Sequence, residues 1–301
     1  MIISRPADPV GAPKTENTPR AIIWMLVTTF FFVAIDVQGK ELLQRYDVTQ
    51  VVAVRFAVHA LFAALVVGIV SPWAVVTRSP RSQIMRSLSL LVTTSLFFMA
   101  VRTVPLAEAS AIMFLGPILI TALSYPLLGE KVGPRRWAGV GFGFLGALLI
   151  IRPGTGFLAG GALLLLGAAL GNAFYQIVTR RLAKRDHPLT TALYTPLVGA
   201  LVTGLAAPAA WISPNAGDWA LMVGMGLAGG IGHLCLIRAI SLAPVAVVSP
   251  FGYTSLLWAS LFGYSFFGDV PDAWTLAGAA VIAMSGLYIL YREQVRGVSV
   301  R

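Results

Sequence analysis

Three ionisable side chains stand inside stretches of sequence that are otherwise apolar: Asp36, Arg55 and Glu108. A charge in such a stretch is costly unless something compensates it, so it commonly marks a binding site or a gate. The three are expected at similar depth, where Arg55, the only Lys or Arg deep in a span, would attract an anionic group or hold a carboxylate. The alternatives are an ion pair that fixes helix register, and side chains that extend to the polar boundary.

A second group of polar residues consists of Asn172, Tyr175 and Gln176, whose i, i+3, i+4 spacing places them on one helix face. Two amides and a phenol offer neutral, directional hydrogen bonds, which suit an organic solute in a cavity; polar packing between helices is the alternative. His233 is a candidate for a coupling proton, although a lone histidine is more often structural. His59 is interpreted as a packed core residue.

No sequence motif for a reaction centre accompanies these residues. The chain contains no HExxH pattern, phosphate-binding loop, GxSxG pattern or paired interior carboxylates. Its lone cysteine, Cys235, excludes an internal disulfide and argues against a thiolate metal site. We therefore expect no enzyme activity, no catalytic residues, no metal and no cofactor.

The elements that must position these residues are apolar stretches of helix length. The chain is 57% hydrophobic and 11% charged, and its mean hydropathy is +0.81, whereas a soluble domain has about twice that charged fraction. Roughly 20 apolar residues span a bilayer core. The apolar stretches show no sustained alternation of polar and apolar residues, which argues against an outer-membrane barrel. We predict an all-α polytopic membrane protein with ten transmembrane helices, at Ala21–Val37, Val48–Val70, Ser87–Val101, Leu106–Leu128, Trp137–Ile151, Phe157–Val178, Thr190–Ile212, Trp219–Leu236, Ala243–Phe267 and Ala273–Tyr291.

The chain repeats itself at a fixed offset of 139 residues. The stretch Val104–Glu130 returns as Ala243–Asp269, and the same offset pairs Gly139 with Gly278 without a gap. We infer two five-helix repeats, residues 21–155 and 156–292, between cytoplasmic tails at 1–20, expected to be disordered, and 293–301. Because five is odd, the second repeat enters the membrane from the opposite side, so the two form an inverted repeat.

The matched stretches carry a matched line of hydroxyl and aromatic side chains. Ser249 and Tyr253 lie on one stripe of the ninth helix, and the offset pairs Tyr253 with Phe114. Such stripes facing each other would line a cavity for planar or amphipathic solutes; ordinary aromatic packing is the alternative. Pro117 and Pro250 lack a backbone N–H and therefore interrupt these helices, either as hinges or as fixed kinks.

The distribution of basic residues predicts the orientation. With the N-terminus in the cytoplasm, inner segments hold 17 Lys and Arg residues and outer segments hold 4, a strong positive-inside signal. Both termini are therefore expected in the cytoplasm, with the chain in the inner membrane. The net charge of +10 is explained by loops beside anionic lipid, so nucleic acid is not an expected partner.

One long stretch of the first repeat resembles a known transporter family. The residues VPLAEASAIMFLGPILITALSYPLLGEKVGPRRWAGVGFGFLGALLIIRPG resemble the EamA-type module of the drug/metabolite transporter superfamily, and the elements AVRF and IDVQGK are also similar. The resemblance covers residues 20–292 and implies a ten-helix inner-membrane carrier that works by alternating access. IDVQGK is similar to uptake members of the S-adenosylmethionine and riboflavin kind, whereas Asp269 departs from the family glutamate.

These observations together predict a secondary active transporter for a small organic metabolite, such as a vitamin or a nucleoside-like solute. An exporter of amino acids or drugs is the alternative in the same class. A membrane-embedded sensor or structural protein without flux is the alternative of another class. The expected partners are the solute, membrane lipid and a coupling proton, and a homodimer is left open.

Overall fold

The computed structural model describes residues 17–128, 133–152, 159–182, 185–243 and 245–295, whose regular elements are all helical. Most of the predicted N-terminal tail lies outside these ranges. The first half of the chain forms α1 (Thr18–Leu42), α2 (Val48–Val70), η1 (Pro72–Val75), α3 (Pro80–Val101), α4 (Leu106–Met113), α5 (Gly116–Leu128) and α6 (Pro134–Ile151). The second half forms α7 (Ala159–Leu182), α8 (Pro188–Ala206), η2 (Ala207–Ala210), α9 (Ala216–Leu242), α10 (Val245–Val248), η3 (Ser249–Tyr253), α11 (Thr254–Phe267) and α12 (Ala273–Val295).

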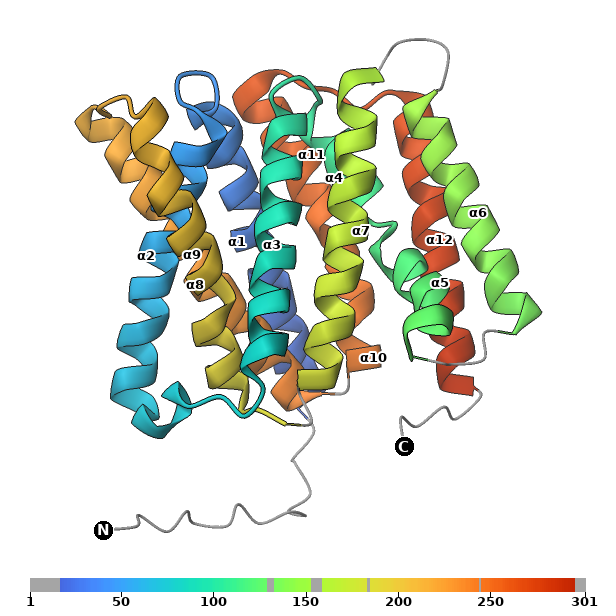
Figure 1. The fold of residues 1–301 in the computed structure, drawn as a ribbon. Coiled ribbons are helices and arrows are strands. Elements are labelled where there is room, and N and C mark those ends of the chain that lie inside the picture. Colours follow the sequence, from blue (N-terminus) through green and yellow to red (C-terminus); the bar gives the residue numbers. More distant parts are fainter. Residues whose placement is uncertain (1–16, 129–132, 153–158, 183–184, 244, 296–301) are drawn as a thin grey trace.

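The helices form an upright bundle in which α1 begins and α12 finishes on the same side, which we call the N-side (Figure 1). Within the described ranges, seven helical stretches are long and apolar enough to cross a membrane, and α6 and α12 contain shorter apolar stretches. The helix predicted at Val48–Val70 has the same first and last residues as α2. Asp47 caps it by accepting a hydrogen bond from the N–H of Thr49 at 2.8 Å, and Pro72 follows its last turn.

Two of the predicted spans are interrupted where the sequence places a proline. The helix predicted at Leu106–Leu128 divides into α4 and α5, and Pro117 stands at the start of the second part. In the second half, α10 gives way to η3, a 3-10 segment that carries Pro250 in its first turn. A proline cannot donate the backbone hydrogen bond that would continue the helix. The hinge role of these residues stays a prediction.

The principal helix contacts join one half of the chain to the other. Helix α1 packs on α9, α3 on α7, α2 on α8 and α6 on α12, and Figure 1 shows α6 beside α12 at one edge of the bundle. Small residues allow a close approach of α6 to α12, because a Cβ on Gly146 would lie 2.8 Å from the carbonyl oxygen of Gly278. At the same interface the Ser285 hydroxyl donates to the Gly139 carbonyl at 2.5 Å.

The 139-residue offset relates contacts as well as sequence. The offset pairs Gly146 with Ser285 and Gly139 with Gly278, so the Gly146–Gly278 contact and the Ser285–Gly139 contact join equivalent positions. Away from that interface, a Cβ on Gly171 would lie 2.7 Å from Thr93 Oγ1, and one on Gly232 would lie 2.8 Å from the Phe32 ring; the offset exchanges these two pairs as well. At these two places, residues that are equivalent in sequence have equivalent neighbours.

Asp186 organises the N-side end of α3. Its carboxylate accepts hydrogen bonds from the Thr77 hydroxyl, from the Arg78 N–H at 2.8 Å and from the Gln83 amide at 2.9 Å. Burial opposes ionisation of Asp186, but these hydrogen bonds outweigh it and lower the pKa of the carboxyl below its usual range. Its stabilising contribution is therefore present above about pH 4 and lost as the pH falls through the lowered pKa.

Asp186→Ala is expected to lower the free energy of unfolding by about 1–3 kcal/mol, because it leaves several donors without an acceptor. Thermal unfolding of the detergent-purified protein measures this. Asp47→Ala is the matched control, since Asp47 is the offset counterpart of Asp186 but is exposed and caps a single N–H. An equal or larger loss in Asp47→Ala would contradict the importance given to Asp186.

Candidate functional site

Arg55 is buried in α2 and faces α3, with 9% of its surface exposed. Its Nη1 donates to Thr94 Oγ1 at 3.1 Å, and its guanidinium lies 5.2 and 5.5 Å from the ring centroids of Phe56 and Phe98. Its Nε is buried and has no hydrogen-bond partner among the described residues. A buried cation usually requires a counter-charge or a complete set of hydrogen bonds, so Arg55 is only partly compensated.

The two carboxylates predicted beside Arg55 lie in different surroundings. Asp36, on α1, is near enough to act electrostatically on Arg55, although no ion pair within 4.0 Å joins these two described side chains. Glu108, in the first turn of α4, accepts a hydrogen bond from the Thr275 hydroxyl of α12 at 3.2 Å. The structure therefore brings Asp36 toward Arg55 and turns Glu108 toward α12.

A second buried arginine, Arg86, corrects the interpretation of the sequence. The helix predicted at Ser87–Val101 leaves Arg86 outside it, among the 17 basic residues of the inner segments, but Arg86 lies inside α3 with 4% of its surface exposed. It donates to Thr179 Oγ1 at 2.6 Å, to Thr195 Oγ1 at 2.5 Å, to the Thr191 carbonyl at 3.1 Å and to the Tyr175 hydroxyl. The expectation that Arg55 is the only Lys or Arg deep in a span is therefore wrong.

The polar face of α7 turns into the bundle but meets two different neighbours. Tyr175 packs under Arg86, with its ring centroid 4.3 Å from the guanidinium carbon. The other two members, Asn172 and Gln176, face the break between α4 and α5, because a Cβ on Gly116 would lie 3.5 and 3.9 Å from their amide nitrogens. No hydrogen bond joins either amide to the described residues, so both remain available to a solute.

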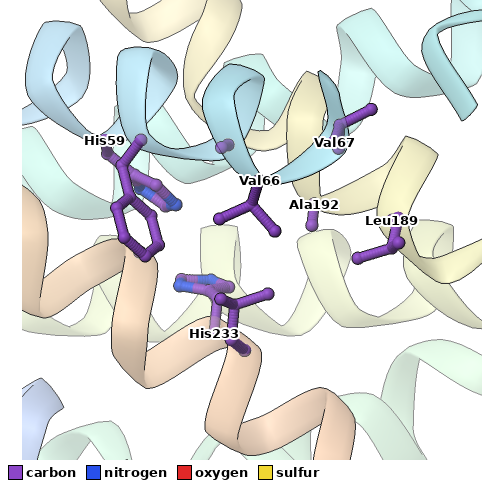
Figure 2. A pocket seen from close by; sticks show the side chains of 10 residues that line it. His59, Val66, Val67, Leu189, Ala192 and His233 are labelled. Carbon is purple, nitrogen blue, oxygen red and sulfur yellow. The ribbon is translucent and has the colours of Figure 1, made fainter. Parts of the chain in front are cut away.

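His59 and His233 form a pair between α2 and α9. Their ring centroids are 5.1 Å apart, and His233 Nδ1 lies within hydrogen-bond distance of the Gly229 carbonyl, at 2.9 Å. Both rings line a cavity of about 10 Å³ that α8 closes with Leu189 and Ala192 (Figure 2). That volume is about the size needed for one water molecule. His59, predicted as a packed core residue, is 2% exposed and lines this cavity from α2, one turn after Arg55.

Tyr253 lies apart from this polar group, on the α12 side of the bundle. Its ring packs on Phe114, its offset counterpart, with centroids 4.8 Å apart. Both line a pocket of about 430 Å³ that opens on the apolar surface, because Leu257 and Leu276 beside it are exposed. Pro250 lines the same pocket. The Tyr253 hydroxyl is buried without a partner among the described residues, and the side chain of Ser249 lies outside them.

Asp36, Arg55, His59, Arg86 and His233 are joined by electrostatic interactions inside the bundle, and we call this group the central cluster. The sequence pattern of the EamA-like transporter family matches residues 19–152 and again residues 159–292. The chain belongs to the EamA-like transporter family. It is therefore a multi-pass membrane protein of a transporter family, and the resemblance noted in the first repeat is confirmed for both.

Named relatives of this EamA-like chain carry small solutes. An S-adenosylmethionine uptake transporter of Rickettsia prowazekii (strain Madrid E) is 25% identical over 273 residues, 91% of this chain and 93% of the relative. A riboflavin transporter of Vibrio cholerae is 31% identical over 191 residues, 63% and 64% of the two chains. A pseudopaline exporter of Pseudomonas aeruginosa is 27% identical over 194 residues, 63% and 67%. A solved crystal structure, 18% identical, shares the fold with a TM-score of 0.61 over 95% of this chain and all of that one.

Ion pairs hold the two halves of the EamA-like bundle together at the end opposite the N-side. Lys40, near the end of α1, pairs with Asp269 at 2.7 Å and lies over the Phe267 ring at 4.7 Å. Arg152, after α6, pairs with Asp272 at 2.5 Å. Each pair joins a residue of the first family match to one of the second. Opening of the bundle at this end requires these pairs to separate.

Lys40→Gln is expected to raise several-fold the rate at which a thiol reagent labels Val37→Cys in a Cys235→Ala background. The reason is that Val37, one turn before Lys40, is buried in this structure, so a reagent would reach it only if this end of the bundle separates. Labelling of the purified protein measures it. Glu41→Gln is the matched control, because its pair with Arg45 is exposed and within one helix. Equal rates in Lys40→Gln and its parent would show that the Lys40 pair does not hold this end closed.

Proposed function

We propose that this protein is a secondary active transporter that moves a small organic metabolite across the inner membrane by alternating access. The observation that carries the proposal is the central cluster. It draws Asp36, Arg55 and Arg86 from the first repeat and His233 from the second, and such residues are costly at membrane depth unless they serve a function. A binding group assembled from two repeats is the arrangement that alternating access requires.

The inverted repeat is part of this proposal. If α4 with α5 counts as one broken span, and α10 with η3 and α11 as another, each repeat contributes five spans and the second runs opposite to the first. The exchange of contacts at the α6–α12 interface supports a two-fold relation between the repeats. The self-contact of the offset pair Phe114 and Tyr253 also supports it, because a pair beside a two-fold axis is expected to meet in this way.

The cargo class is inferred from the side chains and from the relatives together. The central cluster offers charge, while Asn172 and Gln176 offer free amides, and this combination suits a polar organic solute better than a bare ion. The relatives named for S-adenosylmethionine and riboflavin favour uptake. The relative named for pseudopaline favours export, which makes an exporter the second candidate.

Flux measurements in proteoliposomes test the function. The purified protein is reconstituted and given labelled S-adenosylmethionine, riboflavin and a set of amino acids and nucleosides, with and without an imposed proton gradient. Saturable flux above protein-free liposomes, increased by the gradient, is the expected result and would add a coupling proton to the mechanism. Binding of a solute without flux would instead favour a membrane-embedded sensor.

The orientation proposal makes a separate prediction. Both termini and residue 184 are proposed to be cytoplasmic, because basic residues gather in the segments on that side. A cysteine at position 184, in a Cys235→Ala background, is expected to resist an impermeant reagent in intact cells and to react after permeabilisation. A cysteine replacing the exposed Gly217 is the matched control and is expected to react in intact cells. The reverse pattern would invert the proposed topology.

A further inference from the structure

Arg55 presents an unused hydrogen-bonding edge. Its Nη1 is occupied by Thr94, whereas Nε is buried and unpaired and Nη2 makes no hydrogen bond to the described residues. In a guanidinium, Nε–H and the outer Nη2–H point the same way and form a fork. This fork matches the paired oxygens of a carboxylate or phosphate. The two aromatic rings hold the guanidinium in place but satisfy none of these donors.

Positive charge exceeds negative charge around this edge of Arg55. Arg55 and Arg86 both act electrostatically on the His59–His233 pair. The positive charges of the two guanidiniums therefore act on the same pair of side chains. Asp36 is the one carboxylate among the described residues that acts on Arg55. Arg86 is held by three hydroxyls and a carbonyl, all of them neutral. Asp36 therefore faces one of the two cations, and no described carboxylate acts on the other.

The other described carboxylates near the bundle ends do not act on Arg55 or Arg86 and therefore do not supply the missing charge. Asp269 pairs with Lys40, Asp272 with Arg152 and Asp218 with Arg45. Glu108 accepts its hydrogen bond from α12 through Oε1, and its Oε2 is buried without a partner among the described residues, but this carboxylate acts on neither Arg55 nor Arg86. An anion that completes the central cluster therefore has to come from outside the described chain, and a solute that enters the cluster is the group that would bring it.

We propose that the cargo carries an oxyanion, a carboxylate or a phosphate, which binds the Nε–Nη2 edge of Arg55. This inference rests on the proposed transport function and narrows its substrate class. Arg55 is then the specificity-determining residue of the cluster, and Arg86 is a positioning residue that adds to the positive field and holds Tyr175. A neutral analogue of the cargo would leave the buried fork unpaired and would bind more weakly.

Matched solute pairs test the proposal in the same proteoliposomes. One pair is S-adenosylmethionine and its decarboxylated analogue, and the other is riboflavin 5′-phosphate and riboflavin. In the wild type, the anionic member of a pair is expected to be preferred by about tenfold or more, the effect of hydrogen bonds to a charged group. In Arg55→Gln that preference is expected to vanish, mainly through loss of the anionic member. Which pair shows the preference distinguishes a carboxylate cargo from a phosphate cargo.

Two further variants keep the test decisive. Arg55→Lys retains the charge without the fork, so it is expected to keep part of the preference and to report on the site if glutamine prevents folding. Arg102→Gln removes an exposed arginine after α3 and is expected to change nothing. Preference for the neutral members, or equal loss of both members in Arg55→Gln, overturns the oxyanion site while transport stands. No flux of any solute in the wild type overturns the proposed function, and the oxyanion site with it.

Discussion

Arg86→Lys is expected to destabilise the protein more than Arg86→Met, and both variants are expected to lose transport. Lysine keeps a buried charge but cannot reach the acceptors that the guanidinium binds on α7 and α8. An under-compensated buried charge costs about 3–5 kcal/mol, whereas an apolar replacement of similar volume is often tolerated. Methionine also stands at position 225, the offset counterpart of position 86. Transport suffers in both because Tyr175 loses the group that holds it.

The acceptors left behind by methionine retain other partners. The Thr195 hydroxyl donates to the Thr191 carbonyl at 2.7 Å, and the Thr179 hydroxyl donates to the Tyr175 carbonyl, also at 2.7 Å. Thermal unfolding monitored by size-exclusion chromatography ranks the variants. The same two substitutions at Arg81, which is exposed on α3, provide the control and should differ little. A lysine variant more stable than the methionine variant would show that the positive charge itself is needed at position 86.

Helix positions were predicted well where the sequence contains explicit boundary signals. The bounds of α2 were correct because Asp47 and the Ser71–Pro72 step mark them. The interruptions near Pro117 and Pro250 were also foreseen, since proline lacks the donor that an intact helix needs. These are local properties of the backbone, and a single sequence therefore contains them.

Arg86 was missed because hydropathy cannot distinguish a polar helix face inside a bundle from a loop. The first turns of α3, with Arg81, Gln83 and Arg86, are as polar as a connecting segment, so the predicted helix began at Ser87 rather than at Pro80. The polar residues that face inward are recognisable only when α7 and α8 supply their partners. That information lies in the packing of distant segments.

Glu108 shows a related limit. Its position in the sequence gave its depth near the end of a helix, which the structure supports by placing it in the first turn of α4. Depth alone does not determine the direction in which a side chain points around the helix axis. The rotation of α4 is set by its contacts with α11, α7 and α12, and it directs the carboxylate to Thr275. The sequence therefore predicts which kinds of residue form the candidate site, but it does not predict which of those residues lie together in the structure.

Arg55→Gln is expected to leave the amount of folded protein close to that of the wild type and to reduce transport about tenfold or more, as loss of hydrogen bonds to a charged group would. Folding is expected to survive because Asp36 makes no direct ion pair with Arg55, so removal of the guanidinium orphans no tightly paired carboxylate. Glutamine also retains a donor for Thr94. Fluorescence-detected size-exclusion chromatography measures the folded amount, and proteoliposome flux measures transport.

Adding Asp36→Asn to Arg55→Gln separates a role in transport from a role in stability. If Arg55 serves the cargo, the second substitution restores neither flux nor folded protein, because the lost interaction was with the solute. If the two residues form a structural pair, the single variant loses folded protein and the double variant regains it, since no buried charge is left alone. Glu108→Gln, added to Arg55→Gln in place of Asp36→Asn, is the matched control. The Glu108 carboxylate faces Thr275, so this substitution should restore neither flux nor folded protein in either case. Full transport by a well-folded Arg55→Gln protein would remove Arg55 from the mechanism.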